Sequence, residues 1–178
     1  MEDKMIYYKD ENVIIRSMEQ EDSQIIYNEL LDQNYHPSKE IYDGYYIDQE
    51  TNKRFAFIAE YQGSVAGYTT LFAEATTGPF AYKGIPEVVD LHVFIKYQNK
   101  GIGNIILDVV EKIASEISNT ISLGVGLHSG YGAAQRIYVK RNYIPDGSGV
   151  WYMNKQLDQY CSCYNDDDLV LYLSKSLH

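Results

Sequence analysis

Gln98-Asn99-Lys100-Gly101-Ile102-Gly103 stands between a run of strand-forming residues and a long amphipathic helical pattern. The preceding residues 87–95 are mostly apolar, which is typical of a strand at the centre of a sheet. From Ile102 to Ile117, apolar residues recur every three or four positions, which predicts a helix of about four turns. A strand, a glycine-rich turn and a helix in this order indicate a turn that binds a ligand.

The two glycines of this turn, Gly101 and Gly103, suit it to binding an anion. A backbone without Cβ atoms can approach a ligand closely, and free N–H groups at a helix start, helped by about half a unit of positive dipole charge, bind anions. The turn therefore predicts a pyrophosphate site, with a purely structural tight turn as the alternative. A dinucleotide fingerprint would need glycine where Ile106 stands, and the Gly-Lys-Ser/Thr of a Walker loop is absent, so both motifs are excluded.

Strands and helices alternate along the rest of the chain. Before the central strand we expect a strand at 13–16, a helix with its cap near Glu21, a helix from about Ser38 to Asp48, and strands at 55–60 and 65–72 joined as a hairpin. Residues 73–86 predict a loop, and the later elements are a strand at 121–127, a helix ending near Asn142, and strands at 150–157 and 169–173. This mixture predicts an α/β sheet, and the lack of a linker or repeat predicts one domain over residues 1–178.

Composition restricts the class of function. The formal charge of −10 disfavours binding to nucleic acid and favours cationic substrates. No apolar run reaches the roughly 20 residues that span a bilayer, and the first residues lack a secretory signal, so we expect a cytoplasmic protein without a membrane partner. Cys161 and Cys163 are expected to be free thiols, and the sequence predicts no metal site.

The turn and the strand before it resemble the Gln/Arg-x-x-Gly-x-Gly/Ala motif of the GCN5-related N-acetyltransferase (GNAT) family. Ala134 and Tyr138 match the helix motif Asn-x-x-Ala-x-x-x-Tyr-x-x-x-Gly-Phe of the same family, and the order of elements agrees from about Val13 to Leu173. Three positions of the helix motif depart from the family, with Tyr131 in place of Asn, Asn142 in place of Gly and Tyr143 in place of Phe. Asn tolerates the left-handed conformation at a helix end and Tyr fills an aromatic position, whereas Tyr131 puts one cofactor contact in doubt.

The resemblance implies a fold, a cosubstrate and a set of contacts. The fold is the mixed α+β GNAT acyl-CoA N-acyltransferase fold, a central and mostly antiparallel sheet flanked by helices, with splayed central strands at 87–95 and 121–127. The cosubstrate is acetyl-CoA, whose pantetheine amides would bond the backbone of Leu91 and Val93. The residues implied in cofactor binding are Leu91, His92, Val93, Gln98, Asn99, Lys100, Gly101, Ile102, Gly103, Asn104, Tyr131 and Ala134.

The implied reaction acetylates a primary amine of a small molecule or peptide. An alkylammonium has a pKa near about 10.4, so a base is useful at neutral pH. By resemblance Tyr138 is the general acid for the CoA sulfur and Glu87 the base, with Asp90 as the other candidate base. His92 and His128 are more typical of hydrogen-bonded structural histidines than of proton relays.

Two other classes of function stay open at this point. One is a non-catalytic acyl-CoA-binding or regulatory module, and the other is a structural partner protein that binds no CoA. The acceptor is not identified, and a homodimer is left open. Segments 28–50 and 73–86 are expected to line an aromatic acceptor pocket, with Tyr35, His36, Tyr42, Tyr45, Tyr46, Phe80 and Tyr82 as the candidates.

Overall fold

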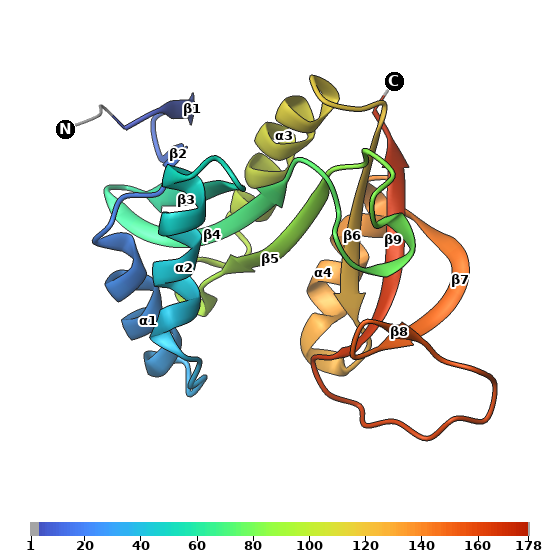
Figure 1. Cartoon of the computed structure of the whole chain (residues 1–178). Coiled ribbons are helices and arrows are strands. Elements are labelled where there is room, and N and C mark those ends of the chain that lie inside the picture. The colour runs from blue at the N-terminus through green and yellow to red at the C-terminus, as the bar shows by residue number, and fades with distance from the viewer. Residues whose placement is uncertain (1–3, 178) are drawn as a thin grey trace. The chain divides into compact units, whose positions relative to one another are not determined.

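The computed structural model describes residues 4–177, which form two compact units. The first unit holds the residues up to Phe72 together with Val89–Lys112, and the second holds Ala73–Val88 together with the residues from Ile113 onward. Strand β5 (Glu87–Val93) therefore begins in the second unit and ends in the first, and its label marks this passage in Figure 1. One domain over the whole chain stays a prediction.

Antiparallel strands form the sheet of the first unit. In hydrogen-bonded order they are β1 (Ile6–Lys9), β2 (Val13–Ser17), β3 (Phe55–Tyr61) and β4 (Ser64–Phe72), with β5 next to β4. The predicted hairpin is confirmed, because Gln62 and Gly63 join β3 to β4 with φ values of 50° and 81°. Strand β1 was not predicted, because its short run lacks the apolar alternation of a half-buried strand.

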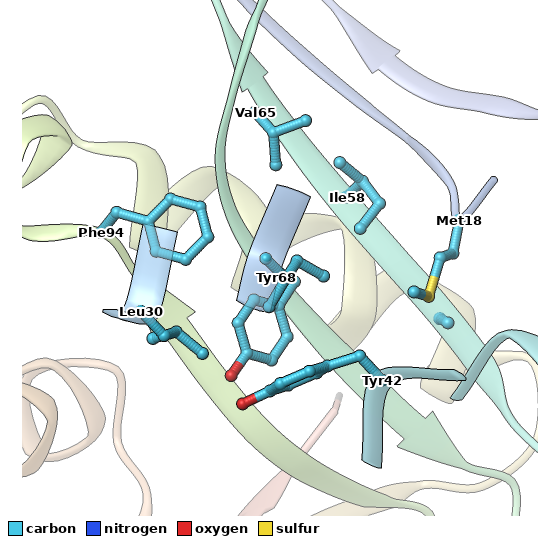
Figure 2. Close-up of a cluster of buried hydrophobic side chains, with 9 residues drawn as sticks. Met18, Leu30, Tyr42, Ile58, Val65, Tyr68 and Phe94 are labelled. Atoms are coloured by element: carbon cyan, nitrogen blue, oxygen red, sulfur yellow. The ribbon is translucent and has the colours of Figure 1, made fainter. Parts of the chain in front are cut away.

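Two helices pack on this sheet. Helices α1 (Asp22–Asp32) and α2 (Lys39–Glu50) contact each other, and they also contact β4 and β3, respectively. Figure 2 shows the apolar cluster of this unit, whose labelled members are Met18, Leu30, Tyr42, Ile58, Val65, Tyr68 and Phe94. Burying a large side chain of this kind contributes about 1.5–3 kcal/mol, so the cluster fixes α2 against β4 and the end of β5.

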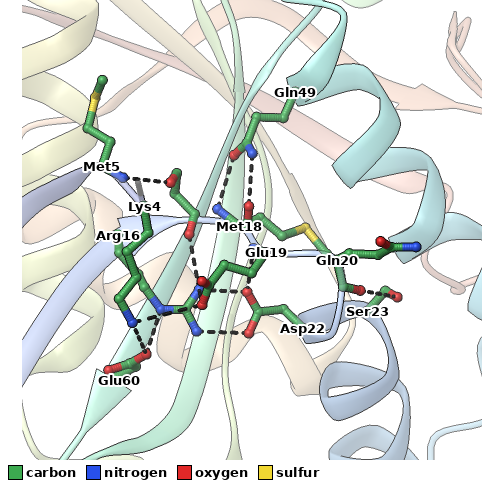
Figure 3. A network of polar contacts seen from close by, with 11 residues as sticks. Lys4, Met5, Arg16, Met18, Glu19, Gln20, Asp22, Ser23, Gln49 and Glu60 are labelled. Carbon is green, nitrogen blue, oxygen red and sulfur yellow. Dashed lines mark hydrogen bonds and ion pairs between the residues drawn. The ribbon is translucent and has the colours of Figure 1, made fainter. Parts of the chain in front are cut away.

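A buried ion-pair network fixes the start of α1. The guanidinium of Arg16 donates to both carboxylate oxygens of Asp22, at 2.6 and 2.8 Å, and to Glu60 at 2.5 Å (Figure 3). Asp22 also accepts from the backbone N–H of Glu19 at 2.7 Å. The prediction of a side-chain cap at Glu21 is wrong, because the N-cap side chain makes no capping bond and the neighbouring carboxylate is committed to Arg16.

Asp22→Asn should lower the free energy of unfolding by about 3 kcal/mol, because it leaves a buried guanidinium without its bidentate partner. Urea unfolding followed by circular dichroism measures the change. Asp43→Asn is the matched control, since Asp43 pairs with Lys39 at the surface and its loss should cost about 0–1 kcal/mol. Equal losses for the two variants would contradict a special contribution from the Arg16 network.

The central strand is shorter than predicted. The expectation of a strand over 87–95 is wrong at its end, because β5 stops at Val93 and Ile95–Tyr97 form a 3-10 turn in which the N–H of Ile95 donates to the side chain of Gln33 at 2.8 Å. Its central place is confirmed, because β5 is the fifth of nine strands in the hydrogen-bonded order, although Asp90 is exposed and has a φ of 58°.

Helix α3 (Ile102–Ser115) follows the turn, as predicted. The predicted apolar positions Ile106, Val109 and Val110 are buried, whereas Ile117 lies beyond the helix and is 42% exposed. The apolar period therefore identified the helix, its length of about four turns and its buried face correctly, and only Ile117 lies outside it.

Strand β9 lies between β6 and β7 in the sheet of the second unit. The elements of this unit are β6 (Thr120–Gly126), α4 (Gly132–Lys140), β7 (Ile144–Tyr152), β8 (Lys155–Gln156) and β9 (Leu169–Ser176), with short 3-10 turns at Gly78–Phe80 and Ser129–Tyr131. Strand β9 pairs antiparallel with β6 and β7, and β8 pairs with β7. The start of β5 pairs with β6 in parallel at Glu87 and Val88.

The single strand predicted at 150–157 is instead part of a hairpin. Met153 and Asn154 have φ values of 49° and 62° and turn the chain between β7 and β8. Asn suits such a turn but Met does not, so the turn was not evident from the sequence. The predicted mixed α+β class with a mostly antiparallel sheet is confirmed. In the described part of the chain, no helix is long and apolar enough to cross a membrane.

Candidate functional site

The turn at 98–103 lies in the first unit and has left-handed residues at Asn99 and Gly101, with φ values of 62° and 81°. A Cβ atom built on Gly101 would meet no heavy atom within 4 Å, so the backbone conformation, and not crowding, favours glycine here. The Gly101 carbonyl accepts from the N–H groups of Asn104 and Ile105 at 3.0 and 3.2 Å. The turn is therefore open in front of a helix start.

The first turn of α3 supplies donors for an anion. The N–H groups of Ile102 and Gly103 belong to the first four of the helix, for which an α-helix provides no internal acceptor. The Nζ of Lys100 lies 5.1 Å from the centre of the Tyr61 ring, which keeps a cation next to the turn. Together these groups can bind a phosphate or pyrophosphate.

The second half of β5, Leu91–Val93, precedes this turn in the same unit. The backbone carbonyl of Val93 accepts from Gln98 Nε2 at 3.0 Å, so Gln98 ties the strand to the turn. A Cβ atom on Gly67 of β4 would come within 2.5 Å of the His92 carbonyl oxygen, so only glycine permits this close approach. Gln98 and Gly67 therefore fix the backbone that leads into the turn.

His92 is half-buried between aromatic rings. Its imidazole stacks on Tyr68 at a centroid distance of 5.8 Å and an interplanar angle of 10°, and Phe94 lies at 5.8 Å. Desolvation lowers the pKa of His92, although the charge of Asp90 opposes this shift. Within residues 4–177, its buried Nε2 has no hydrogen-bond partner. These features favour a neutral imidazole.

Asp90 has a left-handed backbone conformation within β5. Its Oδ2 accepts from the Tyr45 hydroxyl at 3.0 Å, and the Tyr68 hydroxyl lies near the same carboxylate. Desolvation raises the pKa of Asp90, and the two tyrosine hydroxyls together with the charges of His92 and Arg54 act against this rise. The carboxylate therefore lies among aromatic rings although the residue as a whole is exposed.

Glu87, at the opposite end of β5, lies in the second unit and is 7% exposed. Burial raises the pKa of its carboxyl to about 7, the range suited to a general base at neutral pH. The ring of Tyr172 is close enough for the charge of Glu87 to contribute to the raised pKa of that tyrosine. A Cβ atom on Gly78 would overlap this ring at 2.4 Å, so that glycine makes room for Tyr172.

Tyr138 lies on α4 in the same unit, and 6% of its surface is exposed. Its ring contacts Tyr143 at a centroid distance of 5.6 Å. Tyr143 is 1% exposed and Asn142 has a φ of 66°, so the aromatic position and the left-handed helix end predicted for these two residues are confirmed. Ala134 is half-buried one turn before Tyr138.

Tyr131 forms a polar contact with Asp167 in the second unit. Its hydroxyl donates to Asp167 Oδ1 at 2.9 Å, and His128 Nε2 lies 2.9 Å from the same oxygen. His128 Nδ1 accepts from the Gly130 N–H at 3.1 Å. Both ring nitrogens of His128 thus have structural partners.

The predicted site residues are divided between the two units. The first unit contains Asp90, the second half of β5 and the turn, and the second contains Glu87, Tyr131, Ala134 and Tyr138. Of the aromatic acceptor candidates, Tyr42 and Tyr45 contact each other near Asp90, whereas Tyr35 and Tyr82 are 50% and 75% exposed. Arg54 and Tyr68, which adjoin Asp90, were not singled out because nothing local in the sequence links them to it.

Comparison with protein families identifies the chain. The model of the acetyltransferase (GNAT) family matches residues 23–143, which is more than half of the sequence and includes β5, the turn, α3 and Tyr138. The chain belongs to the acetyltransferase (GNAT) family. The GNAT fold expected from the turn is thereby confirmed. A search of curated protein sequences gave no match.

Solved structures of GNAT acetyltransferases have the same fold. An acetyltransferase from Salmonella typhimurium that modifies the N-terminal serine of a 50S ribosomal subunit protein has a TM-score of 0.70 at 10% identity, covering 96% of this chain and 98% of that one. A putative acetyltransferase from Salmonella typhimurium, solved with acetyl-CoA, has a TM-score of 0.67 at 15% identity over 94% and 95% of the chains.

A third similar structure is a chimeric spermidine N-acetyltransferase from Vibrio cholerae and hSSAT. It has a TM-score of 0.67 at 15% identity and covers 93% of this chain and 96% of that one. At these identities the likeness concerns the fold alone. The similar GNAT structures act on different amines, so the acceptor of this chain has to be inferred from its own residues.

Proposed function

We propose that the chain transfers the acetyl group of acetyl-CoA to a primary amine of a small molecule or peptide in the cytoplasm. The observation that carries the proposal is the open turn at Gly101, which presents the N–H groups of the α3 start in a chain of the GNAT family. Similar folds have been solved with acetyl-CoA, and others act on a protein N-terminus or on spermidine.

The turn fits the charged end of acetyl-CoA. The pyrophosphate needs donors and no opposing carboxylate, and Ile102 and Gly103 offer backbone N–H groups beside the cation of Lys100. Gln98, Asn99 and Asn104 border the same turn, and the backbone of Leu91 and Val93 would bond the pantetheine amides as another strand would. Tyr131 and Ala134 complete the proposed contacts, with His92 next to the strand backbone.

The reaction needs a base and an acid, both of which we assign to the second unit. Glu87 accepts the proton that the amine nitrogen loses as it attacks the thioester carbonyl, directly or through water. Its pKa of about 7 leaves roughly half of the carboxyls ionised at neutral pH. As the C–S bond breaks, the Tyr138 hydroxyl donates a proton to the leaving thiolate sulfur, and that proton is restored from solvent.

Release of CoA thiol tests the proposal. Acetyl-CoA is incubated with the chain and a panel of amines that includes alkylamines, a polyamine and peptides with free N-termini, and the thiol is followed with a chromogenic disulfide. We expect amine-dependent release together with an acetylated product seen by mass spectrometry. Binding of acetyl-CoA without release over the whole panel would favour a non-catalytic acyl-CoA-binding or regulatory module, and no binding would favour a structural partner protein.

Gly101→Asp should weaken CoA binding about tenfold or more, because it adds a side chain and a negative charge where the phosphates approach the backbone. Calorimetric titration with CoA measures the affinity. Gly63→Asp is the matched control, because Gly63 has the same φ of 81° and a Cβ there also meets no atom within 4 Å. The two variants carry equal backbone strain, so equal affinities for CoA would refute the role of the turn.

A further inference from the structure

The Asp90 carboxylate is held in place by the protein and can still accept hydrogen bonds from a ligand. Its φ of 58° turns it out of the regular β5 alternation, and its Oδ2 accepts from Tyr45 at 3.0 Å. The Tyr68 hydroxyl also lies near the carboxylate. An ionised carboxylate can accept about four hydrogen bonds, so the bond from Tyr45 leaves capacity for a ligand at this exposed residue.

Aromatic rings surround this carboxylate. Tyr42 contacts Tyr45 at a centroid distance of 5.8 Å and Tyr68 at 5.6 Å, with the rings close to perpendicular in both pairs. His92 stacks on Tyr68. Figure 2 shows the hydroxyls of Tyr42 and Tyr68 pointing toward one another. The Tyr42 and Tyr68 rings are 2% and 3% exposed, so they pack the site from within, and it is the charge of Asp90 that attracts an alkylammonium.

The nearby cation Arg54 is already paired with a carboxylate. The Arg54 guanidinium lies 4.6 Å from the centre of the Tyr45 ring and 4.2 Å from that of Phe72, and its Nε donates to Asp48 at 2.9 Å. The negative charge of Asp48 balances Arg54, and His92 favours its neutral form. A single negative charge, that of Asp90, is left in the cluster, which suits a ligand group with a single positive charge.

Arg54 also helps to fix the backbone next to Asp90. Its Nη1 approaches Thr70 Oγ1 at 3.4 Å, and that hydroxyl donates to the carbonyl of Val89 at 3.1 Å, next to Asp90 in the chain. The face of Tyr45 is covered by Arg54, so Tyr45 contributes its hydroxyl and not its ring face. The carboxylate is thus oriented before any ligand arrives.

We propose that Asp90 is the acceptor-binding residue, whose carboxylate takes the monocationic ammonium group of a primary alkylamine next to the Tyr45 hydroxyl. The inference rests on the proposed N-acetyltransferase function and names its substrate class. It gives the two β5 carboxylates different tasks, because Asp90 binds the ammonium form of the acceptor and Glu87 is left as the base. No bond is made or broken in this binding step.

The test is a binding titration that needs no turnover. The whole chain, labelled with ¹³C at aspartate carboxyls, is titrated at pH 7 with n-butylammonium chloride and, separately, with butan-1-ol, and the Asp90 signal is assigned by its loss in Asp90→Asn. We expect the chemical shift of the Asp90 signal to change when the ammonium is added, with a dissociation constant of about 1–10 mM, and to remain unchanged when the alcohol is added. A chemical shift that does not change with the ammonium, or that changes equally with both compounds, overturns the proposal.

Kinetics with n-butylamine give the second measurement. Asp90→Asn should raise KM about tenfold or more while kcat and CoA affinity change little, because the amide keeps the shape and loses the charge. Asp43→Asn, which removes a carboxylate from α2 outside the cluster, should leave KM unchanged. An unchanged KM in Asp90→Asn would count against the proposal, as would a loss confined to kcat.

The two hypotheses fail in different ways. Ammonium binding at Asp90 without any thiol release would refute the acetyltransferase function and leave an amine-binding site. Thiol release with n-butylamine, combined with a silent Asp90 signal, would support the acetyltransferase and refute the assignment of Asp90.

Discussion

Tyr138→Phe should lower kcat on the order of 100-fold, while CoA affinity stays within about twofold of the parent. The substitution removes the hydroxyl that we assign to protonation of the thiolate and keeps the ring that packs on Tyr143 at 5.6 Å. Because Tyr138 is 6% exposed, the ring fills its buried position in both proteins. Steady-state release of thiol gives kcat, and calorimetric titration gives the affinity for CoA.

Tyr143→Phe is the matched control for that experiment. Tyr143 is also a buried tyrosine of the second unit, and phenylalanine is the residue that the family motif has at this position. It should retain turnover close to that of the parent, since it has no assigned part in the chemistry. If Tyr138→Phe and Tyr143→Phe were equally active, water or another group would have to protonate the sulfur.

The parts of the fold that were predictable are those with a local signal. The hairpin at Gln62-Gly63 was predicted because glycine is the usual residue at a left-handed turn position, and α3 because apolar residues recur with the helical period. The hairpin at Met153-Asn154 was not, since methionine at a φ of 49° gives no sign of a turn. Strand ends such as Val93 depend on tertiary contacts, here the bond from Ile95 to Gln33.

The candidate site likewise has a part that could be predicted from the sequence and a part that could not. The anion-binding turn at Gly101 could be predicted because its glycines and the helix after it are contiguous in the sequence. The surroundings of Asp90 could not, because Tyr45 and Arg54 lie more than thirty residues before it and reach it only through the packing of α2 on the sheet. The raised pKa of Glu87 likewise follows from burial in the fold and not from its neighbours in the sequence.

Glu87 should also make stability depend on pH. Its pKa is raised in the folded protein from 4.5 to about 7, so the unfolded chain ionises first as pH increases. The stability that the neutral carboxyl contributes is complete below about pH 4.5 and is lost as pH rises to about 7, by roughly 3 kcal/mol if burial persists. Removing the charge at this position should therefore change both stability and rate in that pH window.

Glu87→Gln should depress kcat/KM at pH 7 by 100-fold or more, because the amide keeps the shape of the side chain and cannot accept the amine proton. In the parent, the rate should rise with pH and level off near pH 7 as the Glu87 carboxyl ionises.

The variant should lack the inflection near pH 7 and recover part of its rate at high pH, where the solution takes the amine proton in place of Glu87. Urea unfolding of the same variant should give a free energy that exceeds the parent's by an amount that grows between about pH 4.5 and 7 and is constant above. The two readouts separate the causes: an altered stability profile with an unchanged pH–rate profile would mean that Glu87 is a buried carboxyl without a catalytic part, and that a water chain accepts the proton.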